Sequence, residues 1–325
     1  MASTVGLRCR PGFVLYTSDM QITVTPVAPD GLSAACRVLT AHLWGLERDL
    51  LAQRYRDIFT SRQLDPAGLF VAQDKSGVVL GAMIVQSLTG ALGLAWPPRA
   101  EQGRNRLAVE TALVTGCCHL LRERGVKICQ SFAPAAEREE MVSLVQHQFQ
   151  RVTEVVHLHR QTPSGTNVSP VTQPFTFHPF VPDDRKVFTT TLLATYRSSL
   201  DCPELTGDRT PEELLEGFVN PHAKSTPCWN LVHHAGQPIG VVLLDAGAEP
   251  GTWELNYLGL VPTARGRGWG DLLVRFAVGQ SAKAGATRLT LSVDARNRPA
   301  LRLYERHGFQ EYDRRDVYLA SWPKT

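Results

Sequence analysis

Apolar and polar residues alternate with two periods along this chain, and the order of the resulting segments predicts an α/β protein. Apolar positions at every second residue indicate strands, and apolar positions three and four residues apart indicate helices. Over the first 160 residues these patterns predict, in order, a strand at 21–27, helices at 32–43 and 47–60, a hairpin of 69–73 and 78–86, a strand at 91–96, a helix at 106–124, a strand at 126–132, a helix at 137–148 and a last strand ending near His159.

The remaining residues repeat this order of elements. Thr210 followed by Pro211 is typical of a helix start, because threonine can cap the first turn and proline fits its first position. The predicted elements are a strand at 175–181, helices at 184–200 and 210–218, a hairpin of 229–233 and 238–245, a strand at 252–261, a helix at 270–284, a strand at 287–293, a helix at 299–307 and a closing strand within 309–320.

A constant offset of 160 residues relates the two halves. Gly285 falls on Gly125, and each of the two follows a predicted helix. The tetrapeptide 307–310, HGFQ, falls on 147–150, HQFQ, and differs from it at one position. Identities at one offset that also join the same elements predict an internal repeat.

A stretch rich in proline, serine, threonine and glycine separates the two halves. It covers 161–174, QTPSGTNVSPVTQP, and its composition is typical of a linker. We therefore predict one domain at 1–160 and a second at 175–325, joined by this linker.

Composition and charge narrow the classes of function. Hydrophobic residues make up 43% and charged residues 20% of the 325 residues, which is ordinary for a globular protein. A net charge of +3 gives no reason to expect a nucleic-acid partner, which usually requires a concentrated basic face. No apolar run approaches the length of a membrane span, and residues 1–20 lack the apolar core of a secretion signal. We expect a cytoplasmic protein with neither a membrane nor a nucleic acid as partner.

The cysteines predict neither disulfides nor a metal site. No Cys-x-x-Cys pair occurs, and no cysteine lies in a histidine-rich cluster with zinc spacing. Reduced thiols, mostly buried, are the expected state. The seven positions are Cys9, Cys36, Cys117, Cys118, Cys129, Cys202 and Cys228.

A glycine-rich loop in the second half is the first candidate site. It reads Arg265-Gly266-Arg267-Gly268-Trp269-Gly270 and lies between a predicted strand and a predicted helix. Backbone N–H groups converge on such a turn, and the positive end of the helix dipole favours an anion there. Glycine allows the backbone to approach a phosphate closely, and the arginines can add charge-assisted contacts. Taken alone, the loop is equally consistent with a tight connection.

The residues that follow resemble a known family. The stretch 293–309, VDARNRPALRLYERHGF, is similar to the second signature of the GNAT acetyltransferase superfamily, and Arg265-x-x-Gly268-x-Gly270 matches its coenzyme-A loop. The resemblance covers roughly 175–320. It implies a mixed-sheet α/β fold in two tandem GNAT-like domains, with acetyl-coenzyme A as the cosubstrate and no metal.

The same resemblance implies roles for individual residues. The backbone of Leu258, Gly259 and Leu260 pairs with pantetheine amides, the N–H groups of the glycine-rich loop hold the pyrophosphate, and Asn297 contacts the pantetheine arm. Tyr304 lies near the thioester sulfur, where a phenol can act as general acid. The alternative for Tyr304 is an ordinary core aromatic.

Glu254 is the candidate base, in the sequence Trp253-Glu254-Leu255-Asn256-Tyr257. Flanking aromatics can desolvate a carboxyl and raise its pKa, as a general base requires. A solvent-facing strand residue, or one that orients the acceptor, is equally consistent with its position. His233 and His234 are expected to be a solvated pair at a hairpin turn. The resemblance implies that the loops at 201–204 and 206–209 could line the acceptor cleft and read the substrate, but polar loops are usually solvated, and that is the expectation here.

The first half lacks the site residues. At the same offset the glycine-rich loop falls on 105–110, NRLAVE, where no glycine remains and Glu110 places a negative charge beside the expected pyrophosphate. Tyr304 falls on Leu144, and Asn297 on Glu137. We expect the first domain to be non-catalytic. Among tandem members the layout resembles that of mycothiol synthases, in which the second copy is active.

The sequence thus predicts an N-acetyltransferase that moves acetyl directly to an amine. The acceptor stays open between a small amine, an aminoglycoside, an amino sugar and a protein amino terminus, and no oligomeric state is predicted. The alternative is a non-catalytic acyl-coenzyme-A sensor or regulatory module that uses the same loop.

Overall fold

The computed structural model describes residues 13–16, 21–163, 174–219 and 228–322. The predicted linker therefore lies mostly outside the described residues. The elements of the first half are β1 (Phe13–Tyr16), β2 (Gln21–Pro26), α1 (Leu32–Leu39), α2 (Gly45–Thr60), β3 (Leu69–Gln73), β4 (Val79–Leu88), β5 (Leu92–Ala95), β6 (Arg99–Ala100), α3 (Arg106–Glu123), β7 (Ile128–Ala133), α4 (Val142–Val145) and β8 (Gln150–Gln161).

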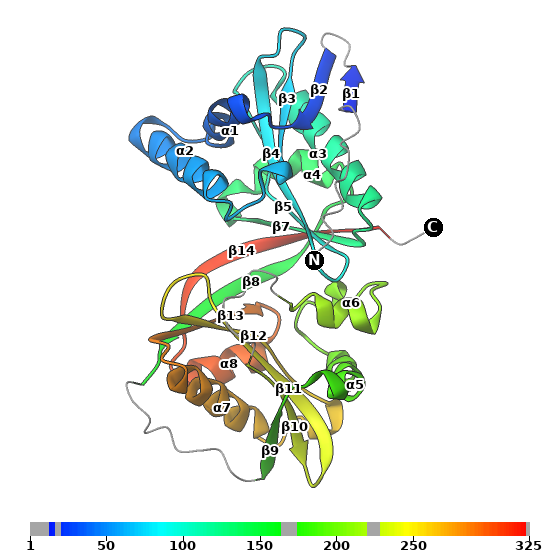
Figure 1. Cartoon of the computed structure of the whole chain (residues 1–325), viewed down its shortest axis with the longest axis vertical. Coiled ribbons are helices and arrows are strands. Elements are labelled where there is room, and N and C mark those ends of the chain that lie inside the picture. Colours follow the sequence, from blue (N-terminus) through cyan, green and yellow to red (C-terminus); the bar gives the residue numbers. More distant parts are fainter. Residues whose placement is uncertain (1–12, 17–20, 164–173, 220–227, 323–325) are drawn as a thin grey trace, which may run out of the picture.

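The second half follows the same plan (Figure 1). Thr210 caps its second helix with a capping box, as its sequence predicts. The elements are β9 (Phe175–Pro179), α5 (Arg185–Tyr196), α6 (Pro211–Glu216), β10 (Cys228–His234), β11 (Gln237–Ala246), β12 (Thr252–Leu260), α7 (Trp269–Lys283), β13 (Arg288–Asp294), α8 (Arg298–Arg306) and β14 (Gln310–Ser321).

Backbone geometry repeats at the offset found in the sequence. Gly125 and Gly285 end their helices with φ of 78° and 81°. Gln148 and Gly308 take φ of 68° and 75°, so a glutamine holds in the first half the left-handed conformation that glycine supplies in the second. The repeat is therefore structural as well as sequential, and the fold consists of two tandem α/β domains.

Three predicted helices differ from the structure. The helix expected at 32–43 ends at Leu39. The helix expected at 137–148 is a 3₁₀-helix over Ala135–Met141 followed by the short α4. In a 3₁₀-helix residues i and i+3 lie above one another, and Glu137 and Glu140 indeed pair with the same guanidinium, that of Arg99. The helix expected at 184–200 ends at Tyr196, before the left-handed Ser198.

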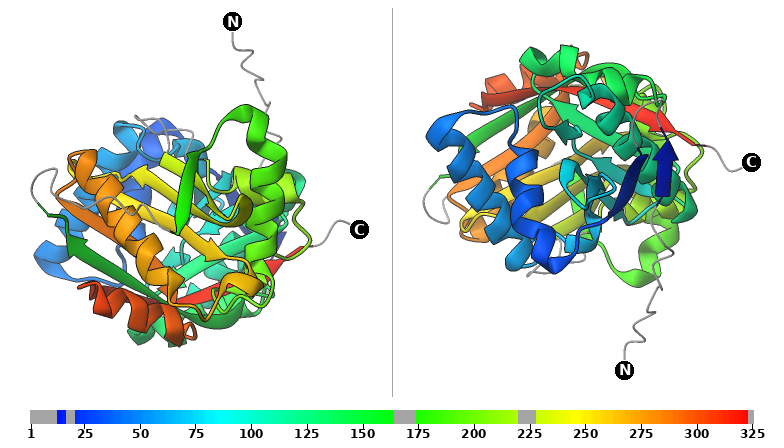
Figure 2. Two further views of the ribbon diagram at one scale, coloured as in Figure 1. Left: turned by 90° about the horizontal axis from the view of Figure 1, so that it is seen from below. Right: turned by 90° about the horizontal axis from the view of Figure 1, so that it is seen from above.

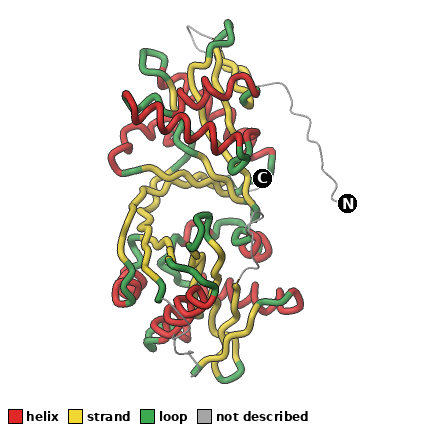
Figure 3. The backbone as a smooth tube through the Cα atoms, turned by 60° about the vertical axis from the view of Figure 1, so that its left-hand side comes forward, coloured by secondary structure: helices red, strands yellow, loops and turns green. Residues whose placement is uncertain are grey.

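The strands of the described ranges form a single sheet of 14 that runs through both halves, and the halves exchange their last strands. The order is β1-β2-β3-β4-β5-β7-β14-β8-β13-β12-β11-β10-β9, with β6 paired to β4. β14, from the end of the chain, pairs with β7 of the first half, whereas β8 pairs with β13 of the second. β8 and β14 also pair with each other, between the two lobes (Figures 1 and 3).

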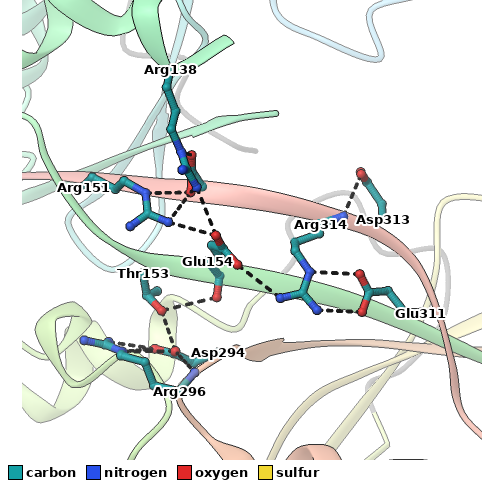
Figure 4. A network of polar contacts seen from close by, with 10 residues as sticks. Arg138, Arg151, Thr153, Glu154, Asp294, Arg296, Glu311, Asp313 and Arg314 are labelled. Carbon is teal, nitrogen blue, oxygen red and sulfur yellow. Dashed lines mark hydrogen bonds and ion pairs between the residues drawn. The ribbon is translucent and has the colours of Figure 1, made fainter. Parts of the chain in front are cut away.

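Ion pairs connect the exchanged strands β8 and β14 with each other and with the first half. The carboxyl of Asp316 on β14 is buried and binds Arg138 and Arg151, both from the first half. Glu154 on β8 pairs with these two arginines and with Arg314 on β14 (Figure 4). The network therefore crosses from the first half to the end of the chain.

Helices pack on both faces of the sheet in each half. In the second half α7 and α8 bury one face, and α5 and α6 pack on β10, β11 and the end of β12 on the other, with separate apolar cores (Figure 2). Glu254 on β12 and Ser292 on β13 are exposed on the remainder of that second face, which we call the open face. In the first half α3 and α4 cover one face and α1 and α2 the other. The loop after α5 packs on β7 of the first half and on the exchanged β14, where Cys202 and Leu205 contact a core that contains Ile128 and Val317.

Candidate functional site

The candidate site begins where two parallel strands of the second half separate. β12 pairs with β13 only from Thr252 to Leu255, although it stays paired with β11 as far as Leu260. Asn256 to Leu260 therefore present a free edge. A cavity of about 430 Å³ occupies the gap. Its lining includes the predicted residues Leu258, Gly259, Leu260, Arg265, Gly266, Asn297 and Tyr304.

Gly259 keeps the free edge of β12 open. A Cβ added there would lie 2.6 Å from a ring carbon of Tyr257 and 2.8 Å from Thr195, so no larger residue fits without displacement. Thr195 also bonds the Tyr257 hydroxyl at 3.0 Å. The backbone of Leu258 to Leu260 is thus exposed to the cavity while its side chains pack elsewhere.

The glycine-rich loop leads from β12 into α7. Gly266 and Gly268 have φ of 72° and 73°, and α7 begins directly after, at Trp269. Among the described residues, the N–H groups of Gly266, Arg267 and Gly268 have no acceptor. Free N–H groups at a helix start are the chemistry that holds a pyrophosphate, so the loop fits the group that its sequence predicts.

The two arginines of this loop have different contacts: Arg265 bonds to backbone carbonyls, and Arg267 is exposed. Arg265 Nε donates to Leu260 O at 2.9 Å, and its other nitrogens donate to Ser198 O at 3.0 Å and Thr195 O at 2.7 Å. Its guanidinium therefore ties the loop to β12 and to the end of α5. Arg267 is exposed and stacks over the ring of Trp269 at 5.0 Å, so it is the arginine of the pair that remains available to an anionic ligand.

Tyr304 lies on α8 at the wall of the cavity. The residue is buried, and its ring contacts Phe309 at 5.6 Å between centroids. Burial raises the pKa of its hydroxyl, and the nearby Asp201 and Tyr257 raise it further. The phenol therefore keeps its proton, which a general acid must do. The structure thus places Tyr304 in the apolar core and at the cavity together.

Asn297 caps α8 and also reaches the cavity. Its side-chain oxygen accepts from the Ala300 N–H at 3.3 Å, and its side chain bonds the carboxyl of Asp201. Asn297 thus fixes the position of α8 and of the loop after α5 at once.

Asp201 is a site residue that the sequence analysis assigned to a solvated loop. It lines the cavity and accepts from the Asp294 N–H at 2.9 Å. Burial raises the pKa of its carboxyl, and the charge of Asp294 adds to that effect. A signal was available at the repeat offset, where Ala41 stands opposite Asp201. The carboxyl is missing from the half that also lacks the counterparts of Tyr304 and Asn297.

Glu254 faces the open side of the sheet, opposite α7 and α8. It pairs across strands with Asp245 and Thr290, and Asn256 beside it donates to Asp245 at 2.6 Å. The carboxyl is accessible to solvent, but the surrounding protein reduces its hydration and raises its pKa, and the charge of Asp245 contributes. The direction of this shift favours proton acceptance near neutral pH.

The corresponding slot in the first half is closed by charged residues. Arg99, buried, pairs with Glu137 and Glu140, and Arg106 bonds the buried Glu110 at 2.9 Å. The cavity that remains measures about 180 Å³. Glu110, predicted to oppose a pyrophosphate, lies inside the protein, where burial raises its pKa.

The hairpin histidines are partly packed rather than fully solvated. The ring of His234 lies 4.7 Å from that of Trp269, and its Nδ1 bonds Pro174 O at 3.1 Å. The ring of His233 contacts that of His178 at 4.5 Å. His234 therefore supports the start of α7.

Three further features bear on the predicted class of protein. The six cysteines of the described ranges are unpaired thiols. In the same ranges, no three residues of the metal-binding types come together. None of the helices there combines the length and the apolar character that crossing a bilayer requires.

Comparisons with known proteins agree with this geometry. The sequence model described as "Acetyltransferase (GNAT) family" matches residues 192–309. Mycothiol acetyltransferase of Jonesia denitrificans is 36% identical over 83 residues, which is 26% of each chain. That of Corynebacterium efficiens is 40% identical over 65 residues, 20% of this chain and 22% of the relative. The matched stretches thus span about a quarter of these relatives.

Solved structures match over nearly the whole chain. A GCN5-related N-acetyltransferase from Sphaerobacter thermophilus has a TM-score of 0.58 at 18% identity, covering 92% of this chain and 95% of that one. A tandem GNAT protein from the clavulanic acid biosynthesis pathway has a TM-score of 0.50 at 14% identity, covering 94% of this chain and all of that one. At such identities the likeness concerns the fold.

Proposed function

Because the carboxy-terminal half of this chain belongs to the acetyltransferase (GNAT) family, we propose that the protein transfers acetyl from acetyl-coenzyme A to an amine. The observation that carries the proposal is the cavity between β12 and β13. Its lining joins the free backbone edge at 256–260, the residue Gly266, whose N–H group is unpaired among the described residues, and the buried Tyr304.

The cosubstrate supplies an acetyl thioester, and each candidate residue has a separate task toward it. Leu258, Gly259 and Leu260 present backbone to the pantetheine arm, next to Asn297. The loop Gly266 to Gly270, with Arg267, holds the pyrophosphate, and Arg265 holds the loop itself. These assignments rest on which residues line the cavity, on the three carbonyls that Arg265 binds, and on the loop N–H groups of Gly266 to Gly268, which have no partner among the described residues.

Proton transfer completes the proposed mechanism. The Tyr304 hydroxyl donates its proton to the departing sulfur, because its raised pKa keeps it protonated. The carboxylate of Glu254 accepts a proton from the acceptor nitrogen on the open face. Binding both substrates side by side also lowers the barrier by removing the entropy cost of their encounter.

We assign catalysis to the second domain, 175–325, and a non-catalytic role to the first, 1–160. The ion pairs of Arg99 and Arg106 occupy the slot of the first domain, and Leu144 stands where the acid would be. The acceptor is an amine on a small molecule or on a protein, reaching the site from the open face of the sheet.

Release of coenzyme A, followed with a thiol reagent over a panel of amines, tests the proposal. We expect turnover with at least one amine, and Tyr304→Phe lowers kcat by about 100-fold or more, as loss of a general acid does. Leu144→Phe, at the equivalent position of the first domain, serves as a matched control and retains full kcat. Binding of acetyl-coenzyme A without turnover for any amine would instead establish the sensor.

A further inference from the structure

The open face of the sheet carries a polar row that continues from the cavity into the exchanged strand. Glu254 on β12 is paired with Thr290 on β13, and Thr290 with His159 on β8, so all three project from one face. One step along the same face, Ser292 pairs with His157. The face of the catalytic domain is thus completed by a strand from the first half.

His157 is joined to the cavity by a hydrogen bond. Its Nδ1 lies 2.8 Å from the Oγ of Ser292, and Ser292 lines the cavity. Among the described residues Nε2 has no partner. The ring of Tyr312, on β14, lies 6.0 Å from that of His157. Burial raises the pKa of the Tyr312 hydroxyl, and the charge of Glu254 raises it further. Ser292 therefore links His157 to the cavity, and Glu254 lies on the same face, in the neighbouring row of cross-strand pairs.

The reaction removes two protons from the acceptor nitrogen, in two successive steps. An alkylamine arrives as an ammonium ion and ends as an amide N–H, so its nitrogen loses one proton before the C–N bond forms and one as the C–S bond breaks. The sulfur regains one of these, through Tyr304, and the other leaves to solvent. Glu254 can take only one of the two at a time.

We propose that His157, contributed by the first half through β8, accepts the first proton of the acceptor ammonium at Nε2. This proposal rests on the proposed acetyltransferase function. With Nδ1–H donating to Ser292 Oγ, Nε2 holds the free lone pair, and the same hydrogen bond persists when the ring is protonated. The proton then passes to solvent across the open face, and Glu254 takes the second one.

The surroundings of His157 favour the neutral ring. Burial lowers its pKa, the carboxylate of Asp313 acts in the opposite direction, and the charge of Arg315 lowers the pKa again. Both of these residues lie on β14, as does Tyr312, while Glu254 faces the same area from β12. At neutral pH the imidazole is therefore unprotonated and ready to accept.

The test compares His157→Gln with wild type for one amine that the panel identifies. At pH 7 we expect kcat/KM to fall by at least about tenfold. Above the pKa of the amine itself, where it arrives uncharged, the two enzymes converge to within about twofold. His159→Gln is the matched control, since His159 lies on the same strand and face and contacts Tyr312 without a bond to Ser292.

A second readout needs no turnover. In a nitrogen-detected NMR titration of the free protein, His157 shows the tautomer protonated at Nδ1 and a pKa below the ordinary value, and Ser292→Ala changes both. A loss in His157→Gln that is equal at all pH values, or no loss, or the opposite tautomer, overturns the role. Absence of any turnover by wild type would instead remove the acetyltransferase proposal itself.

Discussion

Asp316 should be the strongest single support for the strand exchange, and replacing it with asparagine tests how much that support contributes. Its carboxyl is fully buried on β14. It accepts from Arg138 Nη2 at 2.8 Å and from Arg151 Nε at 2.7 Å, and these arginines hold its pKa below the ordinary range. Asparagine keeps the shape and one acceptor oxygen but removes the charge.

The expected cost follows from these contacts. A hydrogen bond to a charged group contributes about 1.5–3 kcal/mol, and removing one partner of a buried pair costs about 3–5 kcal/mol. Arg138 and Arg151 are 45% and 38% exposed, so water can hydrate them when the carboxylate is lost. The lower part of this range applies, and we expect Asp316→Asn to reduce the free energy of unfolding by about 2–3 kcal/mol.

Urea unfolding at neutral pH measures this loss. Asp313→Asn is the control, because Asp313 lies on the same strand and pairs with a partly exposed Arg315, a kind of pair that contributes at most about 1 kcal/mol. Because the pKa of Asp316 is depressed, its contribution is present above the ordinary aspartate range and disappears as the pH falls through the lowered pKa. Equal stability of Asp316→Asn and wild type at pH 7 would refute the reasoning.

Three further predictions concern the cofactor side of the site. Gly259→Ala places a Cβ 2.6 Å from Tyr257, so the KM for acetyl-coenzyme A rises about tenfold or more, and an unchanged KM would contradict the free edge. Arg265→Ala removes the hydrogen bonds that join the loop to three carbonyls, so kcat/KM falls by about 100-fold. Steady-state kinetics should show a smaller loss for Arg267→Ala. Because the pKa of Tyr304 is raised, kcat holds up to about pH 10, and a falling limb near pH 9 would count against its role as acid.

Local patterns predicted most of the elements because each was encoded within its own segment. Thr210 and Pro211 start α6 through contacts made inside its first turn. The differences arise where distant partners decide. The segment at 135–145 begins as a 3₁₀-helix, in which Glu137 and Glu140 both pair with Arg99. The helix α5 ends at Tyr196, and beyond it the carbonyl of Ser198 accepts a hydrogen bond from Arg265.

The residues of the candidate site also divide into those that lie in continuous sequence motifs and one that does not. Arg265 and Gly266 of the glycine-rich loop, and the pair Asn297 and Tyr304, stand in continuous motifs, and these four residues line one cavity. Asp201 stands in no such motif. It reaches the cavity because Asp294, at the end of β13, binds it through the backbone, and Asn297 binds it through its side chain. The signal in the sequence is the comparison of the two copies at the repeat offset, where the counterpart of Asp201 is Ala41.

The exchange of β8 and β14 makes the first half, which we propose to be non-catalytic, a structural part of the sheet of the second. A division at 161–174, drawn from composition, separates β8 from the domain whose sheet it enters. Sequence offers no sign of this, since β8 and β14 have the same pattern and either could close either sheet. The consequence is that His157, although it belongs to the first half, bonds Ser292 at the cavity of the second. An isolated 175–325 fragment would retain Tyr304 and Glu254 and yet lack the strand that completes their open face.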